Sequence, residues 1–289
     1  MIRISDLSAP LSMRPDEYAS LAAKALRIAP REIASCRVFR RSVDARRRDD
    51  VHFTLSLDVS LHGDEAAVLR RAPRVKAELV KPAAPVEIQK CSLGGAPRPV
   101  VVGCGPAGLF AALWLARAGL RPILLERGKS AAARERDVEA FRAGGPLNEE
   151  SNVQFGEGGA GMFSDGKLNS GIKDPRCRAV LEALAAAGAP EEILWQARPH
   201  VGTDKLTQAV VHLRNEIIAL GGEVQFETKL TGLVVSQGAL CAARIKPAAG
   251  SESELSCGRL VLAVGHSARD TFEMLHALGV PMIAKPFSI

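Results

Sequence analysis

Two stretches of the sequence place glycines at the spacing G-x-G-x-x-G, the fingerprint of a turn that binds the pyrophosphate of a dinucleotide. One reads GCGPAG at residues 103–108, and the other reads GEGGAG at residues 156–161. Bare backbone lets a phosphate come close, and a helix that starts at the turn directs its first N–H groups at the negative charge. The segments on either side of each stretch decide whether it can do this chemistry.

The first stretch has the context that such a turn needs. An apolar strand at 100–102 precedes it, and an apolar helix follows that stops at Gly119. We expect Gly103 to permit the tight turn and Gly105 to let the pyrophosphate approach the backbone, while Gly108 packs the helix against the strand. The phosphates would then lie at the helix N-terminus, where the helix dipole favours negative charge.

An acidic residue ends the next expected strand. That strand, at 122–125, runs into Glu126, which is 23 residues after Gly103. A carboxylate at this place accepts hydrogen bonds from the hydroxyls of an adenosine ribose. It would repel a 2′-phosphate, so NADP is disfavoured at this site.

The second glycine stretch lacks this context. The letters SNVQF before it are too polar for a buried parallel strand, and MFSDGKLNSG after it has no helical periodicity. Phe155, Met162 and Phe163 are interleaved with the six glycines of residues 152–171, and flexible linkers lack such large apolar side chains. We interpret it as a folded loop that lies against a flat or phosphorylated ligand, with tight packing alone as the alternative.

Composition sets limits on the class of protein. The chain has 289 residues, 47% hydrophobic and 24% charged, which is typical of a globular protein with room for two domains. No apolar run approaches the ~18 residues of a membrane span, and the first residues do not resemble an export signal. Six scattered cysteines include no C-x-x-C pair. We therefore expect a cytoplasmic protein with reduced thiols, no metal site and no membrane partner.

The periodicity predicts two domains joined by a linker. Residues 1–80 form a small basic α+β domain of the ferredoxin-like kind, residues 81–98 are a Pro-punctuated linker, and residues 99–289 form an α/β, Rossmann-like domain. In the small domain we expect strands at 2–7, 36–43 and 51–61 and helices at 15–28 and 64–71. In the large domain we expect later helices at 174–187 and 204–220 and strands at 223–228, 232–236, 239–245 and 259–264.

A cluster of arginines lies on the expected hairpin of the small domain. Residues 1–97 carry 17 Lys/Arg and 12 Asp/Glu, whereas residues 98–289 carry 21 and 20. An RNA-binding surface is one interpretation, but only Phe39 and Phe53 could stack on bases. We favour a solvated basic hairpin and keep nucleic acid as the alternative partner. The arginines are Arg37, Arg40, Arg41, Arg46, Arg47 and Arg48.

The order of the motifs resembles the glutathione-reductase-like FAD-binding fold. The glycine turn and the strand-end ERG are followed by GGEVQFETKLTGLVV and LVLAVGHS. More narrowly, NVQFGEGGAGMFSDGKL, PHVGTDKL, GHSARDTFEMLHALGVPMIAKPFSI and SVDARRR look like a family of bacterial FAD-dependent dehydrogenases, over nearly the whole chain. The resemblance implies a non-covalent FAD, hydride or electron transfer to or from an unnamed small-molecule substrate, and NAD(P)H as a candidate transient reductant.

The resemblance also implies a set of cofactor contacts. Glu126 would bind the adenosine ribose, Arg127 would lie along the adenine, and Leu230 would contact the adenine through its backbone. The strand that ends at Ala263 and Gly265 would return to the cofactor, next to His266. The glycine turn would hold the pyrophosphate through Gly103, Gly105, Pro106, Ala107 and Gly108. The second stretch would border the pyrophosphate and the isoalloxazine through Gln154, Phe155, Gly156, Gly158, Gly159, Gly161 and Lys167.

Several side chains have candidate roles near the cofactor, but the sequence identifies no catalytic residue. Lys167 could stabilise charge on a reduced flavin or be a solvated loop lysine. His266 could contact flavin or substrate or be structural, and Glu157 is expected to orient the loop. Residues 267–270 have the spacing of a capping box, in which Asp270 would serve the start of a helix.

One departure from the family concerns the end of the chain. Such flavoproteins finish the FAD domain with a late Gly-Asp motif, and none follows Gly265. The sequence stops at KPFSI, so we expect the FAD-binding domain to be incomplete at its C-terminal end.

Overall fold

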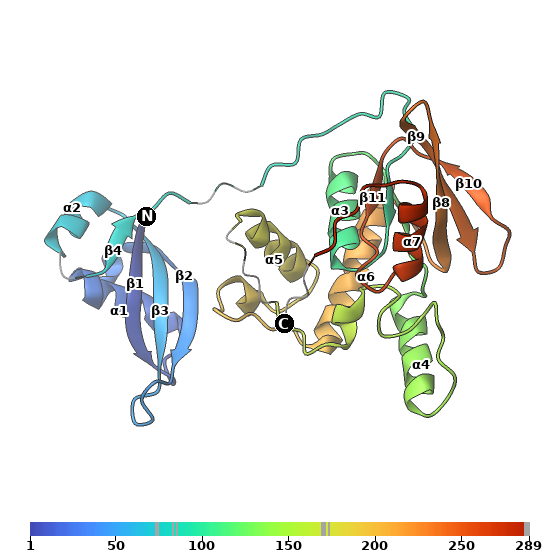
Figure 1. Cartoon of the computed structure of the whole chain (residues 1–289). Coiled ribbons are helices and arrows are strands. Elements are labelled where there is room, and N and C mark those ends of the chain that lie inside the picture. Colours follow the sequence, from blue (N-terminus) through green and yellow to red (C-terminus); the bar gives the residue numbers. More distant parts are fainter. Residues whose placement is uncertain (73–74, 83, 85, 169–171, 173, 286–289) are drawn as a thin grey trace. The chain divides into compact units, whose positions relative to one another are not determined.

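The computed structural model describes residues 1–72, 75–82, 84, 86–168, 172 and 174–285 (Figure 1). Contacts divide the chain into two compact units. The first comprises Met1–Val86, Lys167–Ala185 and Pro190–His200, and the second comprises Glu87–Gly166, Ala186–Ala189 and Val201–Ile289. The predicted domain boundaries stay a prediction, and two positions of the expected linker, 83 and 85, lie outside the described residues, as do the last four residues of KPFSI.

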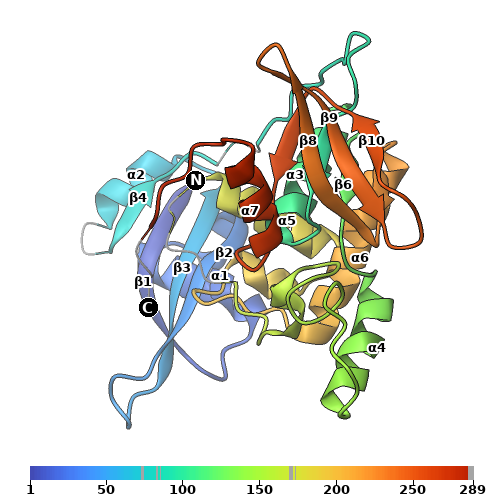
Figure 2. The ribbon, with the colours of Figure 1, turned by 45° about the vertical axis from the view of Figure 1, so that its right-hand side comes forward.

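The N-terminal part of the first unit is a four-stranded antiparallel sheet with two helices (Figures 1 and 2). The elements follow one another as β-α-β-β-α-β, and the strands lie in the order β2-β3-β1-β4. The strands are β1 (Ile2–Pro10), β2 (Ile33–Asp44), β3 (His52–Leu61) and β4 (Ala77–Leu79). The helices are α1 (Tyr18–Leu26) and α2 (Glu65–Arg71).

One face of this sheet carries the core of the small domain. Side chains alternate between the two faces of a strand. Ile2 and Ile4 of β1 and Leu55 and Leu57 of β3 are therefore buried together, with Leu26 of α1 against them. The predicted helix at 15–28 was too long at both ends, because residues 15–17 form a separate 3-10 turn and residue 27 has a positive φ of 57°.

The first unit also includes α5 (Arg176–Ala186), except for its last residue, and a segment that follows it. Arg41 of the edge strand β2 donates its backbone N–H to the carbonyl of Trp195 at 2.8 Å, and its own carbonyl accepts from the N–H of Ala197 at 2.9 Å. The Arg41 guanidinium lies 4.3 Å from the ring centroid of Trp195 and 4.7 Å from that of Phe53. Residues 195–197 thus extend the N-terminal sheet at its edge.

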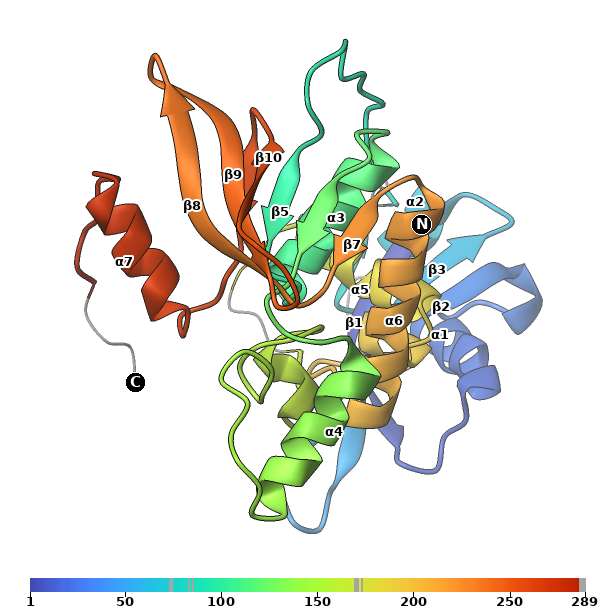
Figure 3. The ribbon, with the colours of Figure 1, turned by 90° about the vertical axis from the view of Figure 1, so that its right-hand side faces the viewer.

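The second unit is built on a parallel sheet with strand order β11-β5-β6-β7. Figure 3 labels two of its strands, β5 and β7, and the helices α3 and α6. Its central strands are short and wholly apolar, as expected for parallel strands covered on both faces. The helices α3 and α6 pack against each other beside it. The strands are β5 (Val100–Val102), β6 (Ile123–Leu125), β7 (Glu223–Gln225) and β11 (Leu260–Leu262). The helices are α3 (Pro106–Arg117), α4 (Ala131–Arg142), α6 (Thr203–Ala219) and α7 (Arg269–Ala277).

A three-stranded antiparallel sheet precedes the return strand β11. It consists of β8 (Thr228–Ser236), β9 (Ala239–Pro247) and β10 (Ser253–Ser256), in the order β10-β9-β8. Its inner side chains share a core with the ends of the parallel strands, where Leu230 and Ile245 pack in the same cluster as Val102 and Leu125. This packing brings the start of β8 to the carboxyl edge of the parallel sheet.

Over the ranges that the structure describes, no helix is long and apolar enough to cross a membrane. Over the same ranges, no three His, Cys, Asp or Glu side chains are grouped so that they could hold a metal ion.

Candidate functional site

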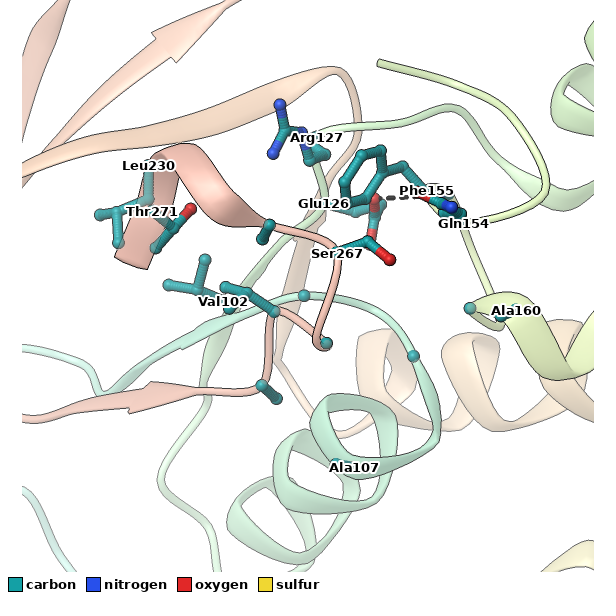
Figure 4. A pocket seen from close by; sticks show the side chains of 18 of the residues that line it. Val102, Ala107, Glu126, Arg127, Gln154, Phe155, Ala160, Leu230, Ser267 and Thr271 are labelled. Atoms are coloured by element: carbon teal, nitrogen blue, oxygen red, sulfur yellow. Dashed lines mark hydrogen bonds between the residues drawn. The ribbon is translucent and has the colours of Figure 1, made fainter. Parts of the chain in front are cut away.

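A cavity opens in the second unit where the carboxyl ends of β5, β6 and β11 meet (Figure 4). In open α/β sheets ligands bind at this edge, outside the ends of the parallel strands. The structure brings most of the predicted cofactor-binding residues to the wall of this one cavity. They are Gly103, Gly105, Pro106, Ala107, Glu126, Arg127, Gln154, Phe155, Gly156, Gly159, Leu230, Ala263, Gly265 and His266.

Four predicted residues lie outside the cavity wall. Gly108 packs helix on strand, because a Cβ there would lie 1.8 Å from the carbonyl oxygen of Gly103. A Cβ on Gly158 would clash with the side chain of Met162, whereas a Cβ on Gly161 would meet no atom of the described residues within 4 Å. Lys167 belongs to the first unit.

The first glycine turn leaves room for a ligand. Gly103 has a φ of 100°, and a Cβ there would lie 2.4 Å from the carbonyl oxygen of Ala263. A Cβ on Gly105 would meet only the Cα of Gly159, at 3.8 Å, so this side of the turn is free. No side chain caps the helix that begins at Pro106. The first amides of a helix have no acceptor within it, so the turn fits a phosphate group.

Glu126 joins the two glycine stretches through backbone amides. Its side chain is 4% exposed. One carboxylate oxygen accepts from the N–H of Cys104 at 2.7 Å, and the other accepts from Gly128 at 2.8 Å and from Gly156 at 2.9 Å. A carboxylate has about four acceptor positions. Three are used here, so one acceptor position of Glu126 is left for a further donor, such as the ribose hydroxyl predicted from the sequence.

The second stretch is folded around a buried arginine. Arg134 of α4 is fully buried, and its guanidinium donates to five backbone carbonyls at distances between 2.7 and 3.4 Å. Burial lowers the pKa of Arg134 to about 10, so the side chain is still a cation at neutral pH. The carbonyls belong to Asn152, Val153, Gly156, Glu157 and Gly159.

Glu157 adds a second buried charge to this loop. One of its carboxylate oxygens accepts from the N–H of Ala131 at 2.7 Å and from the guanidinium of Arg214 at 2.9 Å. Burial raises the pKa of Glu157, and the two donors oppose that shift. These contacts tie the loop to the start of α4 and to α6, which agrees with the expected role of Glu157 in orienting the loop.

Four charged side chains form a network beside Phe155. Arg127 donates to Glu150 at 2.5 Å and to both carboxylate oxygens of Asp270 at 2.9 and 3.0 Å. Lys229 bridges the same two acids, and the Arg127 guanidinium lies 4.2 Å from the ring centroid of Phe155. Burial alone would raise the pKa of Asp270, but the hydrogen bonds from the two cations outweigh it and hold that pKa well below its usual range.

The capping box expected at residues 267–270 was wrong. The residue that caps α7 is Ala268, and no side chain bonds to the free amides of this helix start in the way a box requires. The Asp270 carboxylate forms a bidentate ion pair with Arg127. One of its oxygens also accepts from the backbone N–H of the next residue, Thr271, at 2.9 Å.

Sequence reasoning missed several cavity residues from β8 and α7. Figure 4 shows Leu230 and Thr271 on one side of the cavity and Gln154 and Ala160 on the other. The rule that ligands contact the ends of elements at the carboxyl edge could have found some of these. No sequence rule pointed to Arg134, because it lies in a polar helix, where an arginine is expected to face solvent. Ala160 and Val264 lie within the predicted loop (154–167) and strand end (263–265). The missed wall residues are Val102, Thr228, Lys229, Ser267, Ala268 and Thr271.

Comparison with known proteins shows which family this part of the chain belongs to. The sequence model of a family described as "FAD binding domain" matches residues 98–273. The chain belongs to this FAD-binding domain family. Its cofactor is FAD. A second model, described as a domain of unknown function, matches residues 1–60.

The FAD-binding chain is similar to longer proteins. An uncharacterized protein of Clostridium beijerinckii is 41% identical over 292 residues, which is all of this chain and 53% of that protein. Aklavinone 12-hydroxylase DnrF of Streptomyces peucetius subsp. caesius is 30% identical over 57% of this chain and 35% of its own length. A glycerol-3-phosphate dehydrogenase structure from Bacillus halodurans, complexed with FAD, has 13% identity and a TM-score of 0.40 over 63% of this chain and 36% of its own.

Gly105 provides a direct test of the glycine turn. We expect Gly105→Ala to fold normally, because its methyl group would meet only Gly159 at 3.8 Å. The methyl group would occupy the phosphate position and weaken FAD binding by about 10- to 100-fold, the value of one lost charge-assisted hydrogen bond. Isothermal titration with FAD and thermal unfolding measure the two effects. Gly258→Ala, with open space around it, is the control, and FAD binding by Gly105→Ala at the parent affinity would contradict the assignment.

Asp270 provides a test that depends on pH. We expect Asp270→Asn to lower the stability of the protein at pH 7 by about 1 kcal/mol or less, since the carboxylate is 40% exposed and screened by solvent. The pKa of Asp270 is depressed on folding, so its contribution is present above the unfolded pKa of about 4 and is lost as pH falls through the lower folded pKa.

Thermal unfolding followed by circular dichroism at several pH values measures the difference in stability between the parent and Asp270→Asn. The gap between parent and Asp270→Asn should narrow as the solution is acidified below about pH 4. Asp16→Asn, which breaks an exposed pair with Arg14, is the matched control. A gap that is the same at all pH values would show that the Arg127 and Lys229 contacts do not stabilise the charged form of Asp270.

Proposed function

We propose that the cavity at the carboxyl edge of the parallel sheet is where FAD binds and that the chain is the flavin-holding part of an oxidoreductase. The observation that carries this proposal is the convergence of two glycine stretches on one cavity. The first offers an uncapped helix start, and Glu126 links the first to the second. An anion fits between them because both sides present backbone with little side chain in the way.

The residues of the wall suggest how FAD would be oriented. The N–H groups of Ala107 and Gly108, the first after Gly105 because Pro106 has none, would bind the pyrophosphate. The free acceptor position of Glu126 would bind the ribose. Arg127 and the backbone of Leu230 would border the adenine, and the glycine loop and His266 would lie toward the flavin ring. Bound FAD supplies hydride and electron transfer, and the protein supplies binding and orientation.

We further propose the finer fold assignments made from the sequence. The three antiparallel strands that precede the return strand β11 support a glutathione-reductase-like subtype for the second unit. The β-α-β-β-α-β order of the N-terminal domain supports the ferredoxin-like assignment.

We also propose that the electron donor is a nicotinamide cofactor and that the substrate is a small molecule. No second nicotinamide fingerprint is visible in the sequence, so NAD(P)H would bind transiently. The chain spans about half the length of the Clostridium relative, 53% of it. We also propose that His266, in the cavity wall, contacts flavin or substrate and that the protein is cytoplasmic.

The alternative of RNA binding by the basic hairpin finds little support. Both aromatic side chains that it needs are stacked with the protein's own arginines. Arg3 lies 3.3 Å from the centroid of the Phe39 ring, and Arg41 lies 4.7 Å from that of Phe53. Arg46 forms an ion pair with Asp44 at 2.6 Å. We therefore propose that the hairpin is a solvated basic surface.

The proposed activity can be tested with nicotinamide donors. We expect NADH or NADPH, mixed without oxygen with the FAD-loaded protein, to bleach the visible flavin absorbance faster than it bleaches free FAD. The reason is that a binding site holds donor and flavin together and removes the entropic cost of their encounter. A stopped-flow spectrophotometer measures the rate, with Gly105→Ala plus free FAD as the control. Equal rates for bound and free FAD would contradict an oxidoreductase that uses these donors.

A further inference from the structure

Arg134 lies behind the glycine loop, on the side away from the FAD cavity. It is absent from the wall of that cavity, whereas Gly156 and Gly159 of the loop are part of it. Arg134 lines a separate hollow together with Phe163. Its guanidinium lies 4.8 Å from the centroid of the Phe163 ring. The loop therefore stands between the buried guanidinium and the cavity.

The contacts of Arg134 fix the direction of the loop's peptide groups. A trans peptide points its C=O and its N–H in opposite directions. Five carbonyls point at Arg134, so the N–H groups of the same five peptides point away from its guanidinium. The N–H of Gly158, for example, donates to the carbonyl of Cys104 in the first glycine turn at 2.8 Å. The carbonyl of Gly159 accepts from Arg134 at 2.9 Å, which turns the N–H of Ala160, a residue of the cavity wall, away from the guanidinium.

A buried cation is a costly way to hold a loop. Replacing buried ions by apolar side chains of similar volume is often neutral or stabilising. Arg134 is nevertheless fully buried, forms no direct ion pair with a carboxylate in the described residues, and remains protonated at neutral pH. Its charge is met by carbonyl oxygens and, at longer range, by Glu126 and Glu157. A fixed positive charge behind a cavity favours an anion inside it, and so does a backbone N–H turned away from that charge, as at Ala160.

We propose that Arg134 is a positioning residue that makes the cavity selective for the pyrophosphate of the cofactor. It acts through the loop, by turning carbonyls away from the phosphates, and through its own fixed charge. The proposal rests on the proposed FAD site. It predicts that Arg134 matters for ligands that carry the pyrophosphate and not for the adenine and ribose alone.

The test compares two ligands on one variant of the full chain. We expect Arg134→Met to weaken binding of ADP, which carries the pyrophosphate, by about 10- to 100-fold, the range for a lost interaction with a charged group. Binding of adenosine, which has the same base and ribose, should change by less than about threefold. Isothermal titration measures both. Arg142→Met is the matched control, because Arg142 lies on the same helix, faces the same Phe163 ring at 5.8 Å and is exposed.

A second variant keeps the test decisive if Arg134→Met does not fold. Arg134→Lys retains the apolar stem and the cation but has three N–H donors in place of five. We expect it to bind ADP with an affinity between those of the parent and Arg134→Met, with adenosine binding again unchanged. Equal losses for ADP and adenosine would show a purely structural role and overturn the proposal, as would unchanged ADP binding. Failure of the FAD site itself is recognised separately, because Gly105→Ala would then also leave ADP binding unchanged.

Discussion

The carboxylate of Glu126 accepts hydrogen bonds from Cys104 in the first glycine turn and from Gly156 in the second glycine stretch. The two stretches are about 50 residues apart along the chain and become one site only through such contacts. A buried carboxylate needs donors around it, and the backbone amides of two glycine-rich segments supply them. This side chain at the end of β6 therefore holds both cavity walls, together with the direct hydrogen bond from the Gly158 N–H to the Cys104 carbonyl.

Two further charge systems hold the walls that Glu126 joins. Arg134 and Glu157 hold the loop from behind, and Arg127 and Asp270 tie β6 to the start of α7. Each system includes both signs of charge, which is what allows groups with little exposure to remain ionised. The cavity between them stays lined by glycine backbone and a few apolar side chains, so a dinucleotide can lie close to both walls.

The sequence predicted those parts of the site that depend on local patterns. The strand, turn and helix around Gly103 and Gly105 follow one another within about 20 residues, and each step has its own propensity. The pairing of Arg127 with Asp270 joins positions 143 residues apart and leaves no trace in local periodicity. The local sequence pattern at Asp270 therefore predicted a helix cap and gave no indication of its ion pair with Arg127. Arg134 lies in a helix of mixed polarity, and nothing in its neighbours indicates that it is buried.

Hydrogen–deuterium exchange with and without FAD tests the central claim, that the two glycine stretches form one FAD site. Peptides that cover residues 103–108 and 154–161 are followed by mass spectrometry on the full chain. FAD should slow exchange in both stretches together, because phosphate and ribose would contact the first and also hold the second through Glu126. Protection of only one stretch, or protection elsewhere while FAD is bound, would contradict the account.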